Sequence, residues 1–169
     1  MEENEFMDSG FGQIVDLVKK YEEWEKEKRQ VFLDEENYED IIQFYQDNHE
    51  INKALKVTDT AIEQYPFCAY FCTKKAEIFA NQKRFSEALT LLEESEKLDP
   101  TDINIFLIRA DIKLWQSKHN EALDEVEYAL TVASDKRDKC ELYLEMADIF
   151  EDQEKYTEVV DALKNAILS

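Results

Sequence analysis

Apolar side chains recur at intervals of three and four along residues 13–32. The stripe that they form on a helix consists of Ile14, Leu17, Tyr21, Trp24 and Val31. This pattern predicts an amphipathic helix over 13–33, preceded by an acidic tail at 1–12 that we expect to be flexible. The helix either caps the apolar face of a helical array or pairs as a coiled coil. The cap is favoured because the periodic stretch is shorter than three or four heptads.

Short polar segments separate the later amphipathic runs. The segments read DNHEI, NQKRF, WQSKH and DQEKY, and each stands between two apolar-periodic stretches. Connections this short force the helices on either side to lie antiparallel. The pattern therefore predicts a series of helix pairs.

Glycine is confined to the N-terminal region of the chain. Gly10 and Gly12 are the only two glycines, and residues 13–169 contain none. Parallel sheets, barrels and phosphate-binding loops need backbone conformations that glycine supplies. We therefore expect an all-α fold.

The helix pairs repeat with a fixed period. Pro66 and Pro100 are 34 positions apart, and the same shift aligns Ala54, Ala88 and Ala122. A period of this size indicates stacked helical hairpins. Each proline ends a second helix because it has no amide to continue the hydrogen-bond ladder, and Thr101 or Asp102 then caps the next helix.

These residues resemble the tetratricopeptide repeat (TPR) family, which places an aromatic residue at position 4, small residues at 8, 20 and 27, and proline at 32. With the prolines at position 32, the units lie near 35–68, 69–102, 103–139 and 140–169, the last after three extra residues in SDKRDKC. The resemblance implies an α-solenoid, a right-handed superhelix of about four helix pairs behind the N-terminal cap.

The net charge narrows the choice of partners. Forty acidic residues against twenty basic ones give a formal charge of -20. Such a surface repels nucleic acids and anionic membranes, so we expect neither as a partner. The acids either keep the protein soluble or attract a basic protein or peptide.

Nothing in the sequence indicates catalysis. His49 and His119 fall in helix connectors of different units, and Cys68 and Cys72 lack the further ligands of a zinc site. We therefore expect no enzyme activity, no cofactor and no metal. The three cysteines form no disulfide framework, and the opening MEENEFMDSG lacks the features of a secretory signal, which favours the cytoplasm.

The TPR resemblance also implies a peptide-binding concave face, lined by the first helix of each unit. The residues that it places there are Glu39, Gln43, Tyr70, Thr73, Glu77, Asn104, Leu107, Asp111, Leu144 and Asp148. The row of Glu39, Glu77, Asp111 and Asp148 lies beside Tyr70, Leu107 and Leu144. This row suggests a groove for a basic, partly apolar segment. The alternative is that these acids only solvate an empty face.

A second hypothesis is self-association. The last unit has no following helix to cover its apolar face, and such a face in water marks a contact surface. The uncovered face of the last unit predicts either a homodimer interface at this end or a natural chain that continues. The N-terminal helix is a second candidate for a dimer contact.

Overall fold

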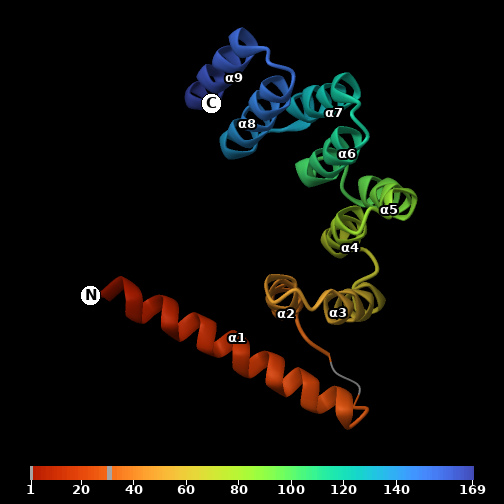
Figure 1. The fold of residues 1–169 in the computed structure, drawn as a ribbon. Coiled ribbons are helices and arrows are strands. Elements are labelled where there is room, and N and C mark those ends of the chain that lie inside the picture. The colour runs from red at the N-terminus through yellow and green to blue at the C-terminus, as the bar shows by residue number, and fades with distance from the viewer. Residues whose placement is uncertain (1, 30–31) are drawn as a thin grey trace. The chain divides into compact units, whose positions relative to one another are not determined.

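The computed structural model describes residues 2–29 and 32–169, with side chains from Gly12 onward. Val31, which belongs to the N-terminal stripe, lies outside the described residues. Those residues form nine helices and no strand (Figure 1). The chain divides into two compact units, unit 1 at Met1–Phe71 and unit 2 at Cys72–Ser169.

Unit 1 holds the long helix α1 (Glu2–Lys26) and the hairpin of α2 (Glu35–Asp47) and α3 (Ile51–Gln64). Helix α1 begins at Glu2 and so runs through residues 2–12, the stretch for which the sequence analysis expects a flexible tail. Glutamates in the first turn interact favourably with the helix dipole. Gly10 and Gly12 each lower helix propensity by about 1 kcal/mol without removing a backbone hydrogen bond.

Helix α1 packs against the hairpin of unit 1. Its residues Val18 and Tyr21 are buried. Lys53 of α3 lies 2.8 Å from the carboxylate of Glu22, and the Tyr45 hydroxyl of α2 donates to the same carboxylate at 3.2 Å. The apolar stripe of α1 therefore covers the α2–α3 hairpin.

Three aromatic rings fill the interior of unit 1. Tyr38 and Tyr65 both lie against Phe71, with ring centroids 6.2 and 6.1 Å apart. The Tyr65 hydroxyl donates to the backbone carbonyl of Leu33 at 2.8 Å. This bond ties the end of α3 to the segment that leads into α2.

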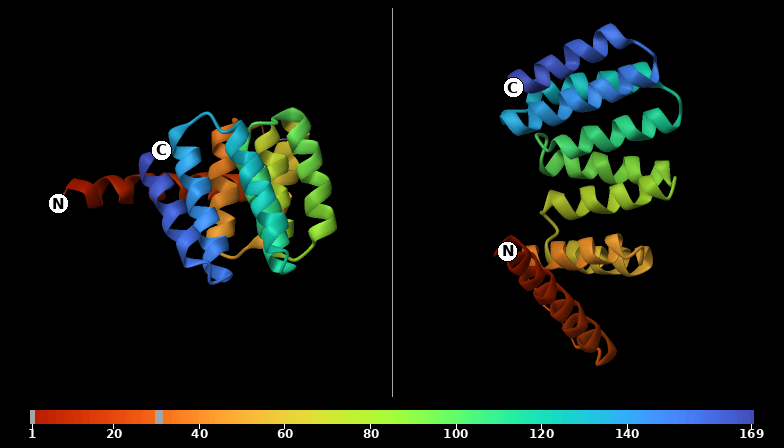
Figure 2. Two further views of the ribbon diagram at one scale, coloured as in Figure 1. Left: turned by 90° about the horizontal axis from the view of Figure 1, so that it is seen from above. Right: turned by 60° about the vertical axis from the view of Figure 1, so that its left-hand side comes forward.

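Helix α4 (Ala69–Asn81) continues from unit 1 into unit 2, where five more helices follow. They are α5 (Phe85–Leu98), α6 (Ile103–Trp115), α7 (His119–Val132), α8 (Lys136–Asp152) and α9 (Tyr156–Leu168). Within unit 2 the hairpins α6–α7 and α8–α9 lie side by side (Figure 2). Pro66 and Pro100 follow α3 and α5, as the period predicts.

Helix α8 begins earlier than the expected unit boundary at residue 140. The segment that we treated as extra residues forms its first turn, because the Asp135 side chain accepts a hydrogen bond from the Arg137 amide at 2.6 Å. The result is a helix of 17 residues, against 13 residues in α6. The extra residues therefore lengthen helix α8, and the connector between α7 and α8 stays short.

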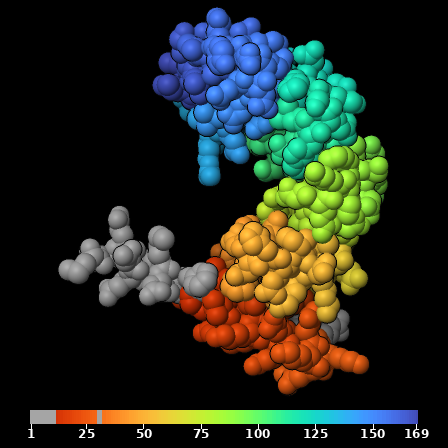
Figure 3. All heavy atoms as spheres, in the orientation of Figure 1, coloured from red at the N-terminus to blue at the C-terminus, as the bar shows by residue number. Residues whose placement is uncertain are grey.

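Small residues line the helix contacts of unit 2. Ala76, Ala88, Ala110 and Ala122 have exposed fractions of 0%. Their small volume lets neighbouring helices approach closely. In the space-filling view the outer surface of these helices, coloured green to blue, covers the alanines (Figure 3). The alanine positions of the 34-residue period are thus fully buried in the unit.

All four hairpin turns have the same backbone conformation. After the first helix ends, one residue adopts a positive φ, and this residue is His49, Lys83, Ser117 or Glu154. In the α6–α7 turn, the Ser117 amide donates to the Leu114 carbonyl and the Lys118 amide to the Lys113 carbonyl. This pair of bonds is a Schellman motif, whose left-handed residue is usually glycine.

We expect Ser117→Gly to stabilise the protein. A left-handed conformation costs a residue with a Cβ roughly 1–2 kcal/mol, and the added freedom of the unfolded chain offsets part of that gain, leaving about 0.5–1 kcal/mol. Urea denaturation measures the change. The matched control is Gln116→Gly, because Gln116 has φ -90, and that change is expected to destabilise. Equal effects of the two substitutions would contradict the account.

Candidate functional site

The residues predicted for the concave face divide between the two units. Glu39, Gln43 and Tyr70 belong to unit 1, and the others belong to unit 2. In unit 1, the exposed Gln43 amide donates to Asp47 at 2.7 Å. Tyr70 is 37% exposed, and the edge of its ring meets Phe71 at 5.4 Å. Glu39 is half-buried on α2.

The structure places Thr73 in the interior of unit 2, so it is not available to a peptide in this structure. Its side chain is 5% exposed. The Thr73 hydroxyl lies 2.6 Å from the Ser95 hydroxyl of α5 and donates to Asp102, the cap of α6, at 3.2 Å. Thr73 therefore links three helices. The TPR resemblance implied a place for Thr73 on the concave face, but its hydroxyl makes polar contacts inside the unit and is buried there.

Asn104 and two leucines occupy the exposed side of α6 and α8. The Asn104 amide side chain donates to Asp102 at 2.8 Å and so completes the cap of α6. Leu107 is half-buried, and Leu144 is 46% exposed. The leucines leave apolar surface in reach of a partner.

Carboxylates gather beside these leucines. Glu77 of α4 pairs with Lys74 at 2.9 Å. Desolvation by the surrounding side chains, together with repulsion from Glu77, raises the pKa of Asp111 on α6. The carboxylates of α4 and α6 are therefore close enough to repel each other.

Glu145 of α8 is the most strongly perturbed of these acids, and our sequence reasoning missed it. Desolvation raises its pKa to about 7, with further repulsion from Asp111, Asp148 and Glu141. The spacing of Glu141, Glu145 and Asp148 by four and three places them on one face of α8. This spacing is the signal that could have identified Glu145, because it stands beside the predicted Asp148.

We call Glu77, Asp111, Glu141, Glu145 and Asp148 the carboxylate cluster. Within the described part of the chain, Asp111, Glu145 and Asp148 have no ion-pair partner. The repulsion among these acids is thus relieved only by water, by a proton or by an external cation. Such an arrangement favours the approach of a positively charged group.

The described residues contain no cluster of histidines, cysteines and acids that could hold a metal ion. Across the same residues, no helix is long and apolar enough to cross a membrane.

Comparison with known proteins shows the fold of the chain. A crystal structure of MamA matches it with a TM-score of 0.66 and 14% sequence identity, covering 95% of this chain and 91% of MamA. MamA MSR-1 C2 matches with a TM-score of 0.53 at 16% identity, covering 79% of this chain and 75% of that one. A mutant of MamA gives 0.50 at 15% identity, with coverage of 79% and 76%.

No family model and no curated protein matches the sequence. The structural likeness and the repeated hairpin together confirm that the chain is an all-α, TPR-like solenoid. At these identities the comparison concerns the fold alone.

We expect Glu145→Gln to stabilise the protein above pH 7 and to have little effect near pH 5. The folded state keeps the Glu145 proton up to about pH 7, whereas the unfolded chain loses it from about pH 4.5. Unfolding therefore releases a proton in this window, and stability falls as the pH rises through it. The glutamine removes a penalty of roughly 2 kcal/mol at pH 8.

Urea denaturation at both pH values measures this effect. The control is Glu127→Gln, since Glu127 is exposed on α7 outside the carboxylate cluster. A gain for Glu145→Gln that is the same at pH 5 and pH 8 would show that the pKa of Glu145 is not raised in the folded protein.

Proposed function

We propose that this chain is a noncatalytic protein-interaction scaffold that binds a basic, partly apolar segment of a partner protein. The observation that carries the proposal is the carboxylate cluster of unit 2, in which Asp111, Glu145 and Asp148 lack a cationic partner among the described residues. Desolvation is the main cause of the raised pKa of Glu145, and lysine or arginine side chains of a partner would relieve the repulsion that adds to it. Part of the binding free energy would then come from the relief of electrostatic repulsion that exists in the free protein.

The leucines beside the cluster supply the apolar part of the surface. Leu144 is 46% exposed and stands one helical turn from Asp148. Leu107 has the same spacing from Asp111 on α6. An acid and a leucine on each of two neighbouring helices suit a segment in which basic and apolar residues alternate.

The test is titration with a fluorescein-labelled synthetic peptide of lysines and leucines, followed by anisotropy. We expect Asp111→Lys with Asp148→Lys to weaken binding by about tenfold or more, because charge reversal replaces attraction with repulsion. The wild-type affinity should also fall as salt is added, since the Debye length shortens to about 10 Å at 0.1 M and exposed charges farther apart than that are largely screened.

The matched control is Asp124→Lys with Glu127→Lys, which makes the same change in net charge at exposed positions of α7. Far-UV circular dichroism checks that both variants are folded. An equal loss of affinity in both variants would mean that net charge alone attracts the peptide. That result, or an affinity that does not respond to salt, would contradict the proposed function.

Self-association is the second candidate function, favoured by the apolar face of α9. Tyr156, Val160, Leu163 and Ile167 are spaced by three and four, with exposed fractions from 41% to 84%. Leu163 holds the same repeat position as Leu92 and Val126, which are 0% exposed. Because α1 uses its buried stripe to cover the unit 1 hairpin, α9 is the better candidate for a contact between copies.

Light scattering over a dilution series tests this second candidate. Self-association through α9 predicts a mass that decreases on dilution, and Val160→Lys with Ile167→Lys should give a monomer throughout. A constant monomer mass for the wild-type chain would exclude it.

A further inference from the structure

Two hairpin turns of unit 2 lie next to each other along one edge. Phe85 begins α5 after the first turn, and Trp115 ends α6 before the second. Their rings are stacked, with centroids 5.7 Å apart and planes inclined by 22°. We call residues 82–85 and 115–119 the turn edge.

The turn edge is locally basic, because residues 82–85 and 115–119 contain three lysine or arginine residues and no acid. The cations in or beside the two turns are Lys83, Arg84, Lys113 and Lys118, and only Glu87 and Glu121 oppose them as ion-pair partners. Lys83 has no ion-pair partner within the described residues. A local excess of positive charge on a chain of formal charge -20 is the opposite of what its composition predicts.

An exposed tryptophan stands among these cations. Trp115 is 47% exposed, although one face of its indole is held by Phe85. The guanidinium carbon of Arg84 lies 3.8 Å from the ring centroid of Phe79, so the turn also orders its arginine. Ordered tryptophan and arginine side chains are the residue types that dominate binding energy at protein interfaces.

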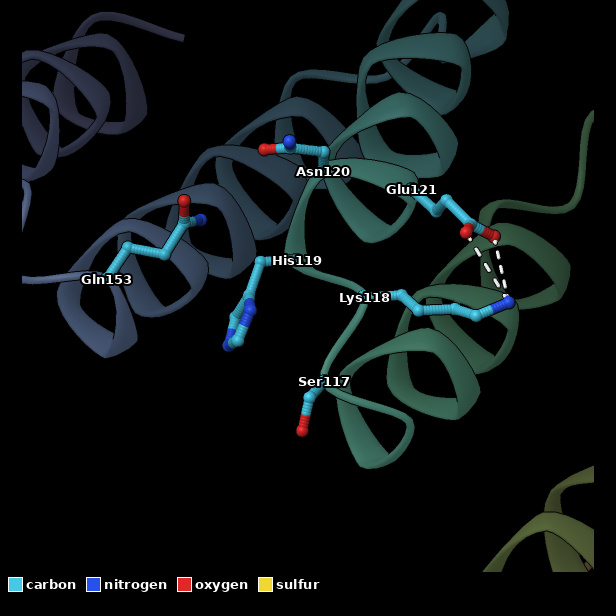
Figure 4. Close-up of a pocket in the computed structure, with 6 residues that line it drawn as sticks. All are labelled: Ser117, Lys118, His119, Asn120, Glu121 and Gln153. Atoms are coloured by element: carbon cyan, nitrogen blue, oxygen red, sulfur yellow. Dashed lines mark hydrogen bonds and ion pairs between the residues drawn. The ribbon is translucent and has the colours of Figure 1, made fainter.

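A pocket adjoins this edge and adds hydrogen-bonding groups. It has a volume of about 310 Å³ and is lined by Ser117, His119, Asn120 and Gln153, with Lys118 and Glu121 at its side. His119 and Gln153 face the same space from α7 and the end of α8, whereas Lys118 turns away toward Glu121 (Figure 4). The pocket therefore offers polar side chains at the α6–α7 turn, which is part of the turn edge.

We propose that the turn edge docks an acidic segment of a partner protein that carries an aromatic residue. The aromatic residue packs on Trp115, and the carboxylates of the segment face Lys83 and compete with Glu87 and Glu121 for Arg84 and Lys118. The argument rests on charge complementarity at an ordered aromatic surface. This surface consists of hairpin turns and is separate from the carboxylate cluster, so the two sites select segments of opposite charge.

The overall negative charge of the chain does not prevent this contact at physiological salt. The screening length there is about 8 Å, so the cations of the edge act on a docked segment more strongly than distant carboxylates do. Lower salt should therefore strengthen binding less than it does for a basic peptide at the carboxylate cluster.

The probe is a fluorescein-labelled synthetic peptide in which glutamate alternates with phenylalanine. We expect Lys83→Glu with Lys118→Glu to weaken its binding by about tenfold, because reversed charges repel the glutamates. The control is Lys136→Glu with Arg137→Glu, two exposed cations at the start of α8. This control makes the same change in net charge and should alter the affinity by less than about twofold.

Two further measurements locate the contact. In a Trp24→Phe background, the remaining indole fluorescence comes from Trp115 and should change on binding. The lysine and leucine peptide should bind the turn-edge variant as well as it binds the wild type, which separates this proposal from the proposed function.

The proposal fails if the acidic peptide does not bind at millimolar concentration, or if both double variants bind it equally. It also fails if Trp115 fluorescence stays unchanged in the bound state. Binding of phosphatidylglycerol vesicles without binding of the peptide would assign the edge to a membrane surface and overturn the proposal.

Discussion

The close approach of helices at small residues is the contact on which the rest of the structure depends. Ala88 and Ala122 recur one period apart, and both are fully buried. A larger side chain at these positions would separate the helices or force strained rotamers, at a cost of roughly 1–3 kcal/mol. The repeat therefore fixes the distance between neighbouring helices before any surface residue is considered. The extra turn at the start of α8 leaves this contact unchanged, because it adds length only at the end of a helix.

The electrostatics of unit 2 follow from that packing. The first helices of successive hairpins become neighbours, and acids at similar positions on them come within range of one another. Desolvation by neighbouring side chains then adds to their repulsion, which is why Glu145 holds its proton up to about pH 7. The turns are set by the same repeat, and they place Phe85 against Trp115 at the basic edge. The same helix packing thus positions both the acids of the carboxylate cluster and the cations of the turn edge.

The sequence predicts the fold well because its signals are local and repeated. Proline, alanine and aromatic positions recur with the period, so the helix pairs could be read directly from the chain, and the cap of α6 could be narrowed to Thr101 or Asp102, of which the structure shows Asp102. The predicted site was less complete, because side-chain partners depend on packing between helices. The TPR resemblance implied that Thr73 lies on the concave face, although its hydroxyl bonds inside the unit to Ser95 and Asp102. Glu145 was missed because the sequence analysis took site residues from fixed repeat positions. Burial and the repulsion from neighbouring acids, which distinguish Glu145, cannot be seen in those positions.

The measurement that tests this account most directly is a carbon-detected NMR titration of the Glu145 carboxyl group in the intact protein. The account predicts that this carboxyl titrates with a pKa of about 7, because burial desolvates it and the acids of α6 and α8 repel its charge. A pKa near the ordinary glutamate value of about 4.3 would show that these helices do not bring their carboxylates together, and would contradict the account.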